Sequence, residues 1–205
     1  RHGMLTWNEV NEFGAGANSG NAEGLTELGK KAVKIMQEKK MRVDVSHLND
    51  AGFWDICKLT SAPIMASHSN SRALCDVRRN LTDEQLRAVR DLDGVVGLNS
   101  CHDFTDSDMD KQTVRRLAEH GAHMIDVMGI EHVMLGFDFF EFCEEFAAGD
   151  IDIEHGFYTP AVKGMKDSSE IPNLSIEFER MGMSQEEMEK IAYKNVPDFI
   201  KKTIG

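Results

Sequence analysis

The chain lacks long apolar runs, paired cysteines and an excess of positive charge. Its 205 residues contain no apolar stretch near the ~20 residues that a membrane-spanning helix needs, so no membrane segment is predicted. With 35 acidic residues against 23 Lys and Arg, the net charge of −12 argues against nucleic acid and anionic membrane surfaces as partners. The four cysteines have neither CxxC nor zinc-finger spacing, which favours free thiols in a reducing cytoplasm; they are Cys57, Cys75, Cys101 and Cys143.

A methionine is also absent from the first position, where the chain reads Arg1-His2-Gly3. We therefore expect a processed or truncated chain. The composition, with 41% hydrophobic and 28% charged residues, is that of an ordinary globular protein. At this length we expect a single domain with one core over residues 1–205.

Apolar runs typical of strands alternate with segments of helical spacing. The strand-like runs cover residues 3–7, 43–47, 63–68, 94–99 and 133–138. Between them, helices are predicted after Thr26, with Asp50 as a cap, after Thr82 in a capping box with Gln85, and over 110–128. Strands and helices in this order predict an α/β fold with a parallel sheet.

Five such units are fewer than the eight of a closed barrel, which typically needs about 250 residues. Two interpretations remain open. The fold is either an open α/β sheet, or a (β/α)8 TIM-barrel type with the last five βα units present and the first three missing. The non-methionine start favours the second interpretation.

The last third of the chain departs from this alternation. Residues 139–172 are acidic and aromatic, which predicts an irregular loop over the strand ends that forms a wall of a binding site. Two helices are expected to close the chain, one near residues 174–181 and one from Ser184. The run Ser184-Gln185-Glu186-Glu187 has the form of a capping box.

Polar side chains follow most of the predicted strands. His47 and His68 end two successive strands, and the other ends carry Trp7 with Asn8, Asn99 and Asp138. In a βα barrel the C-terminal strand ends line the active site. Neighbouring strands lie about 4.8 Å apart, so the two imidazoles can share one metal ion. The pair therefore predicts part of a metal site.

The other histidines are not assigned to this site. His120 and His123 lie three residues apart on a predicted helix, a spacing that can bind metal. Barrel helices face outward, however, so a polar helix surface is the preferred interpretation. No partner at metal-ligand spacing accompanies the four that remain, which are His2, His102, His132 and His155.

Several short blocks, in this order and spacing, carry a specific resemblance over nearly all of the chain. They include Leu5-Thr6-Trp7-Asn8, Val43-Asp44-Val45-Ser46-His47, Pro63-Ile64-Met65-Ala66-Ser67-His68-Ser69-Asn70, Arg78-Arg79-Asn80-Leu81, Gly136-Phe137-Asp138-Phe139 and Gly164-Met165-Lys166-Asp167. In these blocks the sequence resembles the renal (membrane) dipeptidase family of zinc peptidases, which has a (β/α)8 barrel fold.

The resemblance implies a role for each matching residue. His47 and His68 would bind one of two zinc ions, and Arg79 would hold the substrate, since its planar fork suits a peptide carboxylate. Asp138 would handle the proton near the scissile bond. Trp7 and Asn8 would contact the substrate. The implied reaction is hydrolysis of dipeptides by a zinc-bound hydroxide.

Three departures from the family pattern limit this comparison. The opening His-x-Asp motif and the Glu that bridges both zinc ions are not in this chain, which would hold at most one zinc ion, partly liganded. Trp7 replaces a substrate-binding histidine and cannot reproduce its hydrogen bond to a developing oxyanion. The usual Asp-Phe-Asp-Gly run reads Asp138-Phe139-Phe140-Glu141, so the second carboxylate is lost.

Two other functions therefore remain open. The protein is alternatively another metal-dependent amidohydrolase acting on an N-acyl or cyclic amide, or a small-molecule binding homologue in which Trp7 and Phe140 mark lost catalysis. An incomplete barrel also exposes strand edges that invite pairing. We thus expect either a homo-oligomer or a companion fragment with the missing N-terminal strands.

Overall fold

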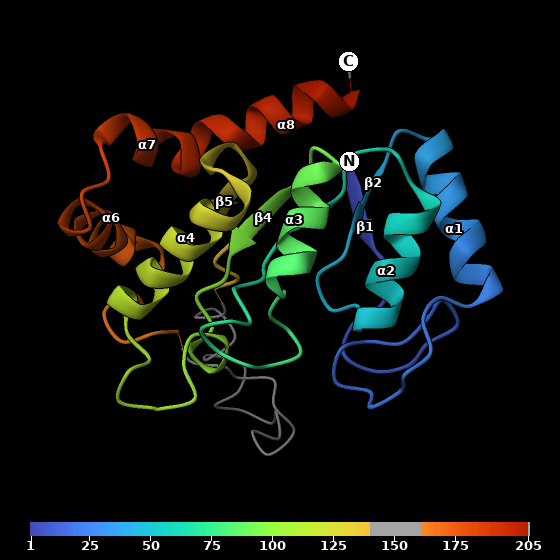
Figure 1. Cartoon of the computed structure of the whole chain (residues 1–205), viewed down its shortest axis with the longest axis horizontal. Helices are drawn as coiled ribbons and strands as arrows, with labels where there is room; N and C mark the ends of the chain where they lie inside the picture. The colour runs from blue at the N-terminus through green and yellow to red at the C-terminus, as the bar shows by residue number, and fades with distance from the viewer. Residues whose placement is uncertain (140–160, 205) are drawn as a thin grey trace.

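Five parallel strands form the centre of the computed structural model, which describes residues 1–139 and 161–204 (Figure 1). The strands lie side by side in sequence order, and every neighbouring pair is parallel. They are β1 (His2–Met4), β2 (Arg42–Asp44), β3 (Met65–Ala66), β4 (Val95–Leu98) and β5 (Val133–Leu135). The predicted α/β fold with a parallel sheet is confirmed. Each of the five strands ends before its predicted position, the first at Met4 instead of residue 7.

A helix connects each strand to the next, and a side-chain cap begins each helix. The helices are α1 (Glu27–Glu38), α2 (Asp50–Leu59), α3 (Asp83–Asp91) and α4 (Val114–Met128). Thr26 caps α1 as predicted, and the capping box of Thr82 with Gln85 is present. The cap predicted at Asp50 is wrong by one residue. Asn49 caps α2, because its Oδ1 accepts the N–H of Gly52 at 2.8 Å.

The long helix α4 begins four residues later than predicted. The carboxylates of Asp106 and Asp108 accept the N–H groups of residues 108 and 110 at 2.9 and 3.1 Å. These local bonds hold the backbone in turns that compete with a helix. Thr113 then caps the helix by accepting the N–H of Arg116.

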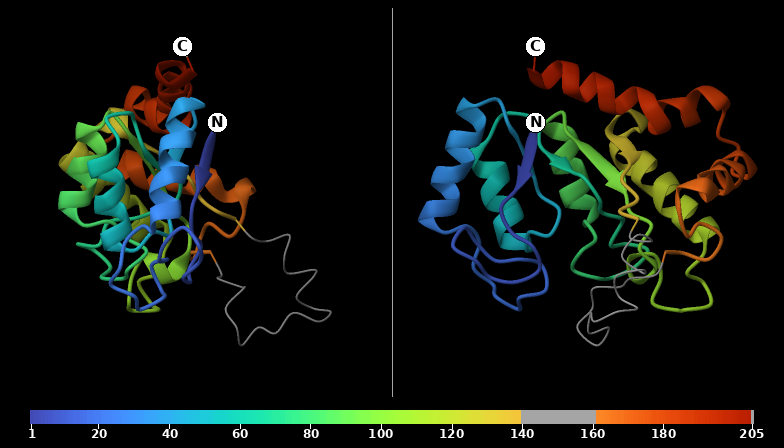
Figure 2. Two further views of the ribbon diagram at one scale, coloured as in Figure 1. Left: turned by 90° about the vertical axis from the view of Figure 1, so that its right-hand side faces the viewer. Right: turned by 180° about the vertical axis from the view of Figure 1, so that it is seen from behind.

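The two faces of the sheet differ, and the strand register shows how. One face packs against the connecting helices, which lie together on one side of the sheet in Figure 2. Its buried side chains are Val43, Val45, Ala66, Val96, Leu98 and Val133. The opposite face alternates with it, since successive side chains of a strand point to opposite sides. It carries Arg42, Asp44, Met65, Val95, Gly97 and Met134.

The C-terminal end of the chain covers the end of the sheet where strands β4 and β5 begin (Figure 1). The last helix, α8 (Asn195–Ile204), places Phe199 against Met65, Val95 and Met134 in a small second cluster. The side-chain amide of Asn195 donates to the carbonyl oxygens of Ile130 and Val133, both at 2.7 Å. These two bonds fix the start of α8 to the segment that enters β5.

The other described elements are helices and helical turns. They are η1 (His102–Phe104), η2 (Ile130–His132), η4 (Ser168–Glu170), α6 (Ile171–Arg180), α7 (Gln185–Glu189) and the π-helical turn η5 (Lys190–Lys194). The predicted capping box of Ser184 with Glu187 is present at the start of α7. Helix α6 begins three residues before the predicted position, and Pro172 fits its first turn, where no N–H donor is required.

The sheet is open at both edges within the described ranges. Strands β1 and β5 each pair with one neighbour only. Most of the loop predicted over residues 139–172 lies outside the described residues. Its last part, from Ala161, pairs with the segment after β4, since the N–H of Val162 donates to the Ser100 carbonyl at 3.1 Å. Among the helices of the described ranges, none is long and apolar enough to cross a membrane.

Candidate metal and substrate site

The imidazoles of His47 and His68 meet at the C-terminal edge of the sheet. His47 follows β2 by three residues, and His68 follows β3 by two. Their Nε2 atoms lie 2.8 Å apart, and their ring centroids are separated by 4.9 Å. The structure thus brings together the two histidines that the sequence places at successive strand ends.

The outer nitrogen of each ring has its own hydrogen-bond partner. Nδ1 of His47 lies 2.9 Å from Oδ1 of Asn8, and Nδ1 of His68 lies 2.7 Å from Oγ of Ser67. Because an amide oxygen can only accept, His47 carries its proton on Nδ1 and presents the lone pair of Nε2. Metal-binding histidines in proteins are oriented in this way by a partner on the other ring nitrogen.

Burial keeps both imidazoles neutral. It lowers the pKa of His47 to about 2, with the charges of Arg79 and His68 adding to the effect. Burial also lowers the pKa of His68, again with Arg79, while the carboxylates of Asp138 and Asp44 oppose the shift. Neutral imidazole is the form that binds a metal ion.

These two side chains fit part of a zinc site. Two imidazole nitrogens on one tetrahedral zinc ion lie about 3.3 Å apart, so a shift of about half an ångström would accommodate the ion. A third ligand is not in place, because no group of three or more His, Cys, Asp or Glu side chains suited to a metal occurs in residues 1–139 and 161–204. The carboxylate of Asp138 lies beside the pair, with Oδ2 3.9 Å from Nε2 of His68.

The backbone at two of these residues is left-handed. His47 has a φ of 70° and Asp138 a φ of 59°. Residues other than glycine adopt this conformation infrequently, and such residues cluster at functional sites. Each of the two residues lies three positions after a strand, β2 or β5, so the left-handed turn directs their side chains along the C-terminal edge of the sheet.

Asp44 joins the two histidine-bearing turns, a role that the sequence did not reveal. Its side chain is fully buried. Oδ1 accepts the N–H groups of Ser46 and Ser67 at 3.1 and 3.0 Å. The Ser46 hydroxyl in turn accepts the N–H of His68 at 3.1 Å. The sequence does contain one indication of this role, a carboxylate between two valines of an apolar strand. A charge buried in such a strand needs buried hydrogen-bond partners.

Arg79 is a buried cation beside the histidine pair. Only 4% of its surface is exposed, and burial lowers its pKa to about 10. Nη2 donates to the carbonyl of His68 at 3.4 Å, and the guanidinium lies 5.2 Å from the ring centroid of Phe104. Its Nε is buried and makes no hydrogen bond to any described residue. Arg79 therefore keeps donors that an anion can satisfy.

Trp7 and Asn8 lie beside His47 at the same edge, and their contact with a substrate stays a prediction. Trp7 is 52% exposed, and its ring centroid lies 6.2 Å from that of His47. Asn8 contacts the other side of His47 through the hydrogen bond already described. Phe140 and Glu141, at which the run after Asp138 departs from the family pattern, lie outside the described residues.

His120 is not on a polar helix surface, and that prediction is wrong. Its side chain is fully buried, where it bonds to Ser71 and Thr105. His123 is partly exposed and lies 2.8 Å from the Asp83 carboxylate. The difference arises because α4 faces the loops after β3 and β4 as well as the sheet, so that a histidine on its side becomes enclosed.

Comparisons with known proteins show that this chain is similar to metallopeptidases. A metallopeptidase of Rhodobacter sphaeroides, solved with a phosphinate mimic of the dipeptide L-Ala-D-Ala, superposes with a TM-score of 0.82 and 30% identity, covering 99% of this chain and 56% of that one. The sequence model of the membrane dipeptidase family (peptidase family M19) matches residues 1–203. The chain belongs to this family.

Relatives from curated proteins agree with this assignment. An uncharacterized dipeptidase of Schizosaccharomyces pombe is 32% identical over 99% of this chain and 46% of its own length. An uncharacterized protein of Klebsiella pneumoniae is 42% identical over 65% of this chain and 52% of its own length. The chain thus spans about half the length of the curated relatives it matches. An amidohydrolase of Pseudomonas aeruginosa, with a TM-score of 0.84 at 21% identity, shares the fold.

Proposed function

We propose that this chain supplies part of the binuclear zinc site and of the substrate pocket of a dipeptidase. The observation that carries the proposal is the 2.8 Å approach of two neutral imidazole nitrogens, each held by a hydrogen bond on its far side. His47 and His68 are the ligands of one zinc ion in this proposal. Membership of the metallopeptidase family supports it.

A bound zinc ion lowers the pKa of a water molecule and polarises the scissile carbonyl. The residues of this chain do the remaining work. Asp138, 3.9 Å from Nε2 of His68, is placed to accept and return a proton at the scissile bond. Arg79 binds the carboxylate of the dipeptide, because its buried Nε lacks a partner among the described side chains.

Trp7 and Asn8 form the side of the pocket next to His47. The exposed indole of Trp7 gives this wall an apolar surface. The contact of Asn8 with the substrate is less direct than that of Trp7, since Oδ1 of Asn8 already holds the His47 ring. A pocket with a cation at one end and an apolar wall suits a small amino-acid derivative with a free carboxylate.

For the fold, we propose that the single domain represents the last five units of a (β/α)8 barrel. Five consecutive strand–helix units with all the connecting helices on one face of the sheet support this proposal. The two edge strands of the described sheet, β1 and β5, would then take up further strands, from the same protein or from a companion fragment, or would pair with another copy. Sedimentation of the purified protein distinguishes these arrangements.

The enzymatic proposal is tested by metal content and turnover of the protein expressed from its complete reading frame. We expect bound zinc and hydrolysis of dipeptides, with loss of one zinc ion and of activity in H47A and H68A. His123→Asn is the matched control, because that histidine lies away from the strand ends. Faster turnover of N-acyl amino acids would favour the amidohydrolase alternative, and absence of both metal and turnover would contradict a hydrolase.

A further inference from the structure

The loop after β3 carries both proposed site residues, with His68 at its start and Arg79 near its end. The two ends of the loop meet. The N–H of Leu81 donates to the Asn70 carbonyl at 2.9 Å, and the N–H of Arg72 donates to the Leu81 carbonyl at 2.7 Å. The position of Arg79 therefore depends on what holds this loop, here called the arginine loop (residues 68–81), against the rest of the molecule.

Two fully buried asparagines attach the arginine loop to the segment after β4. The side-chain amide of Asn80 donates to the carbonyl of Phe104 at 2.8 Å, and its oxygen accepts the N–H of Asn70 at 3.2 Å. Asn70 exchanges two hydrogen bonds with the backbone of Asn99, both at 2.9 Å. Phe104, whose ring lies against the Arg79 guanidinium, is thus bonded to the residue next to Arg79.

His120 of α4 attaches the same two segments from the other side. Its Nδ1 accepts the N–H of Ser71 at 3.1 Å, and its Nε2 donates to the carbonyl of Thr105 at 2.7 Å. Ser71 belongs to the arginine loop, and Thr105 directly follows Phe104. Because both bonds are made at once, the neutral ring is fixed with its proton on Nε2.

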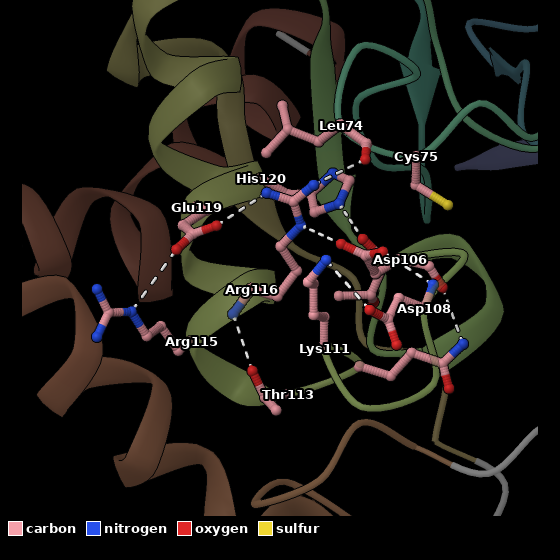
Figure 3. A network of polar contacts seen from close by, with 12 residues as sticks. Leu74, Cys75, Asp106, Asp108, Lys111, Thr113, Arg115, Arg116, Glu119 and His120 are labelled. Atoms are coloured by element: carbon pink, nitrogen blue, oxygen red, sulfur yellow. Dashed lines mark hydrogen bonds and ion pairs between the residues drawn. The ribbon is translucent and has the colours of Figure 1, made fainter.

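Figure 3 shows that His120 lies within a larger set of polar contacts at the start of α4. One turn before His120, Arg116 donates from Nη2 to the carbonyl of Leu74 in the arginine loop at 2.9 Å. Its Nε lies 2.8 Å from the carboxylate of Asp106. Helix α4 therefore contacts the arginine loop at two points and the segment after β4 at two more.

Arg79 itself has one direct hydrogen bond in the loop, the 3.4 Å contact to the His68 carbonyl. The Phe104 ring and the Asn80 backbone fix the rest of its geometry. We propose that His120 is a positioning residue for Arg79: by joining Ser71 to Thr105 it sets the distance between the arginine loop and Phe104, and so aims the guanidinium at the substrate carboxylate. The proposal rests on the proposed function of Arg79.

The test compares two substrates of the zinc-loaded, full-length protein, a dipeptide and the matching dipeptide amide, which lacks the terminal carboxylate. The measured quantity is the ratio of their kcat/KM values. In R79A this ratio should fall at least tenfold. In H120L it should fall about as far, through a higher KM for the dipeptide, because the misplaced guanidinium no longer favours the carboxylate.

Three further variants separate positioning from general stability. H120N places an amide oxygen about where Nδ1 lies but loses the donor to the Thr105 carbonyl, so the ratio should fall, though less than in H120L, which loses both bonds. H120Q keeps a donor near the Thr105 carbonyl but loses the acceptor for Ser71, so it should lower the ratio. This variant tests the proposal if H120L fails to fold. H123N, on the same helix and bonded to Asp83 instead of the arginine loop, should leave the ratio unchanged.

Amide hydrogen exchange gives a readout that does not depend on turnover. Exchange over residues 69–81 should accelerate in H120Q and not in H123N. An unchanged ratio in R79A would overturn the role of Arg79, and the positioning proposal with it. A reduced ratio in R79A together with an unchanged ratio in H120Q and H120L would overturn the positioning role alone.

Discussion

The buried carboxylate of Asp44 accepts the backbone N–H of Ser67 at 3.0 Å, across the boundary between β2 and β3. The same oxygen accepts the N–H of Ser46, on the turn that leads to His47. One atom therefore sets the spacing of the two histidine-bearing turns. The convergence of His47 and His68 therefore involves this bond as well as the pairing of β2 with β3.

Replacing Asp44 should therefore affect both stability and metal binding. D44A leaves two buried N–H groups without an acceptor, which we expect to cost about 2–4 kcal/mol in the free energy of unfolding. Zinc affinity should fall about 10–100-fold, because the imidazoles are no longer held in register. Urea unfolding and zinc titration measure the two effects.

Asp198 offers a control for this experiment, since its side chain is 64% exposed and its 3.2 Å ion pair with Lys201 lies at the surface. D198A should change stability by less than about 0.5 kcal/mol. An unaltered zinc affinity in a folded D44A protein would contradict the coupling between the carboxylate and the histidine pair.

Replacing Arg79 should affect the substrate more than the fold. R79K keeps a positive charge but loses the planar fork, so kcat/KM for dipeptides should fall about 10–100-fold, which corresponds to about 1.4–2.8 kcal/mol. Steady-state kinetics measure the loss. R78K is the matched control, because Arg78 is exposed and should tolerate the change. Equal losses in both variants would argue against a specific role for Arg79.

Local patterns in the sequence predicted much of the fold. The Thr82 capping box depends on residues three positions apart, and the strand ends at His47 and His68 depend on short apolar runs. Both are local signals. The placement of Arg79 beside the histidines came from resemblance to a family, since nothing in a pair of adjacent arginines predicts which one is buried.

Long-range contacts explain where the structure differs from the sequence-based predictions. Adjacent residues Asn49 and Asp50 can each cap a helix. The choice of Asn49 follows the path of the loop before α1, because the Asn49 amide donates to two carbonyls of that loop, at residues 21 and 23. The burial of His120 depends on the loops after β3 and β4, both distant in sequence from α4. Helical periodicity predicts which face of a helix packs against the sheet, but it cannot identify the loops that cover the other sides of the helix.

Burial of His120 should make stability depend on pH. Burial holds the pKa of His120 at about 4, below its ordinary value of 6.5, with Arg116 and His123 adding to the shift and Thr105 and Asp106 opposing it. Between pH 6.5 and about 4 the unfolded state therefore binds more protons, so stability falls as the pH falls through this range. The loss should approach about 3 kcal/mol.

The comparison that isolates this effect is wild type against H120N, by urea unfolding between pH 7 and 4 without added metal. Asparagine does not titrate, so the variant should lose about 3 kcal/mol less stability across the range. Other histidines, His47 among them, contribute equally to both proteins and cancel in the difference. Parallel curves for the two proteins would show that His120 titrates normally.

Gly97 of β4 packs against the backbone that leads into His68. A Cβ at Gly97 would lie 2.0 Å from the Ser67 carbonyl oxygen, and one at Gly136 would lie 1.9 Å from the same atom. Since backbone cannot yield as a flexible side chain does, G97A should cost about 3 kcal/mol or more. It should also displace His68 and weaken zinc binding.

Gly3→Ala provides the matched control, because a Cβ there would lie 3.4 Å from the mobile end of the Met36 side chain. That variant should keep wild-type zinc affinity and change the free energy of unfolding by less than about 1 kcal/mol. Thermal unfolding and zinc titration compare the two alanine variants directly. A G97A protein with wild-type stability would mean that β3 and β4 are farther apart than the structure shows, and the geometry of the His47–His68 pair would have to change with them.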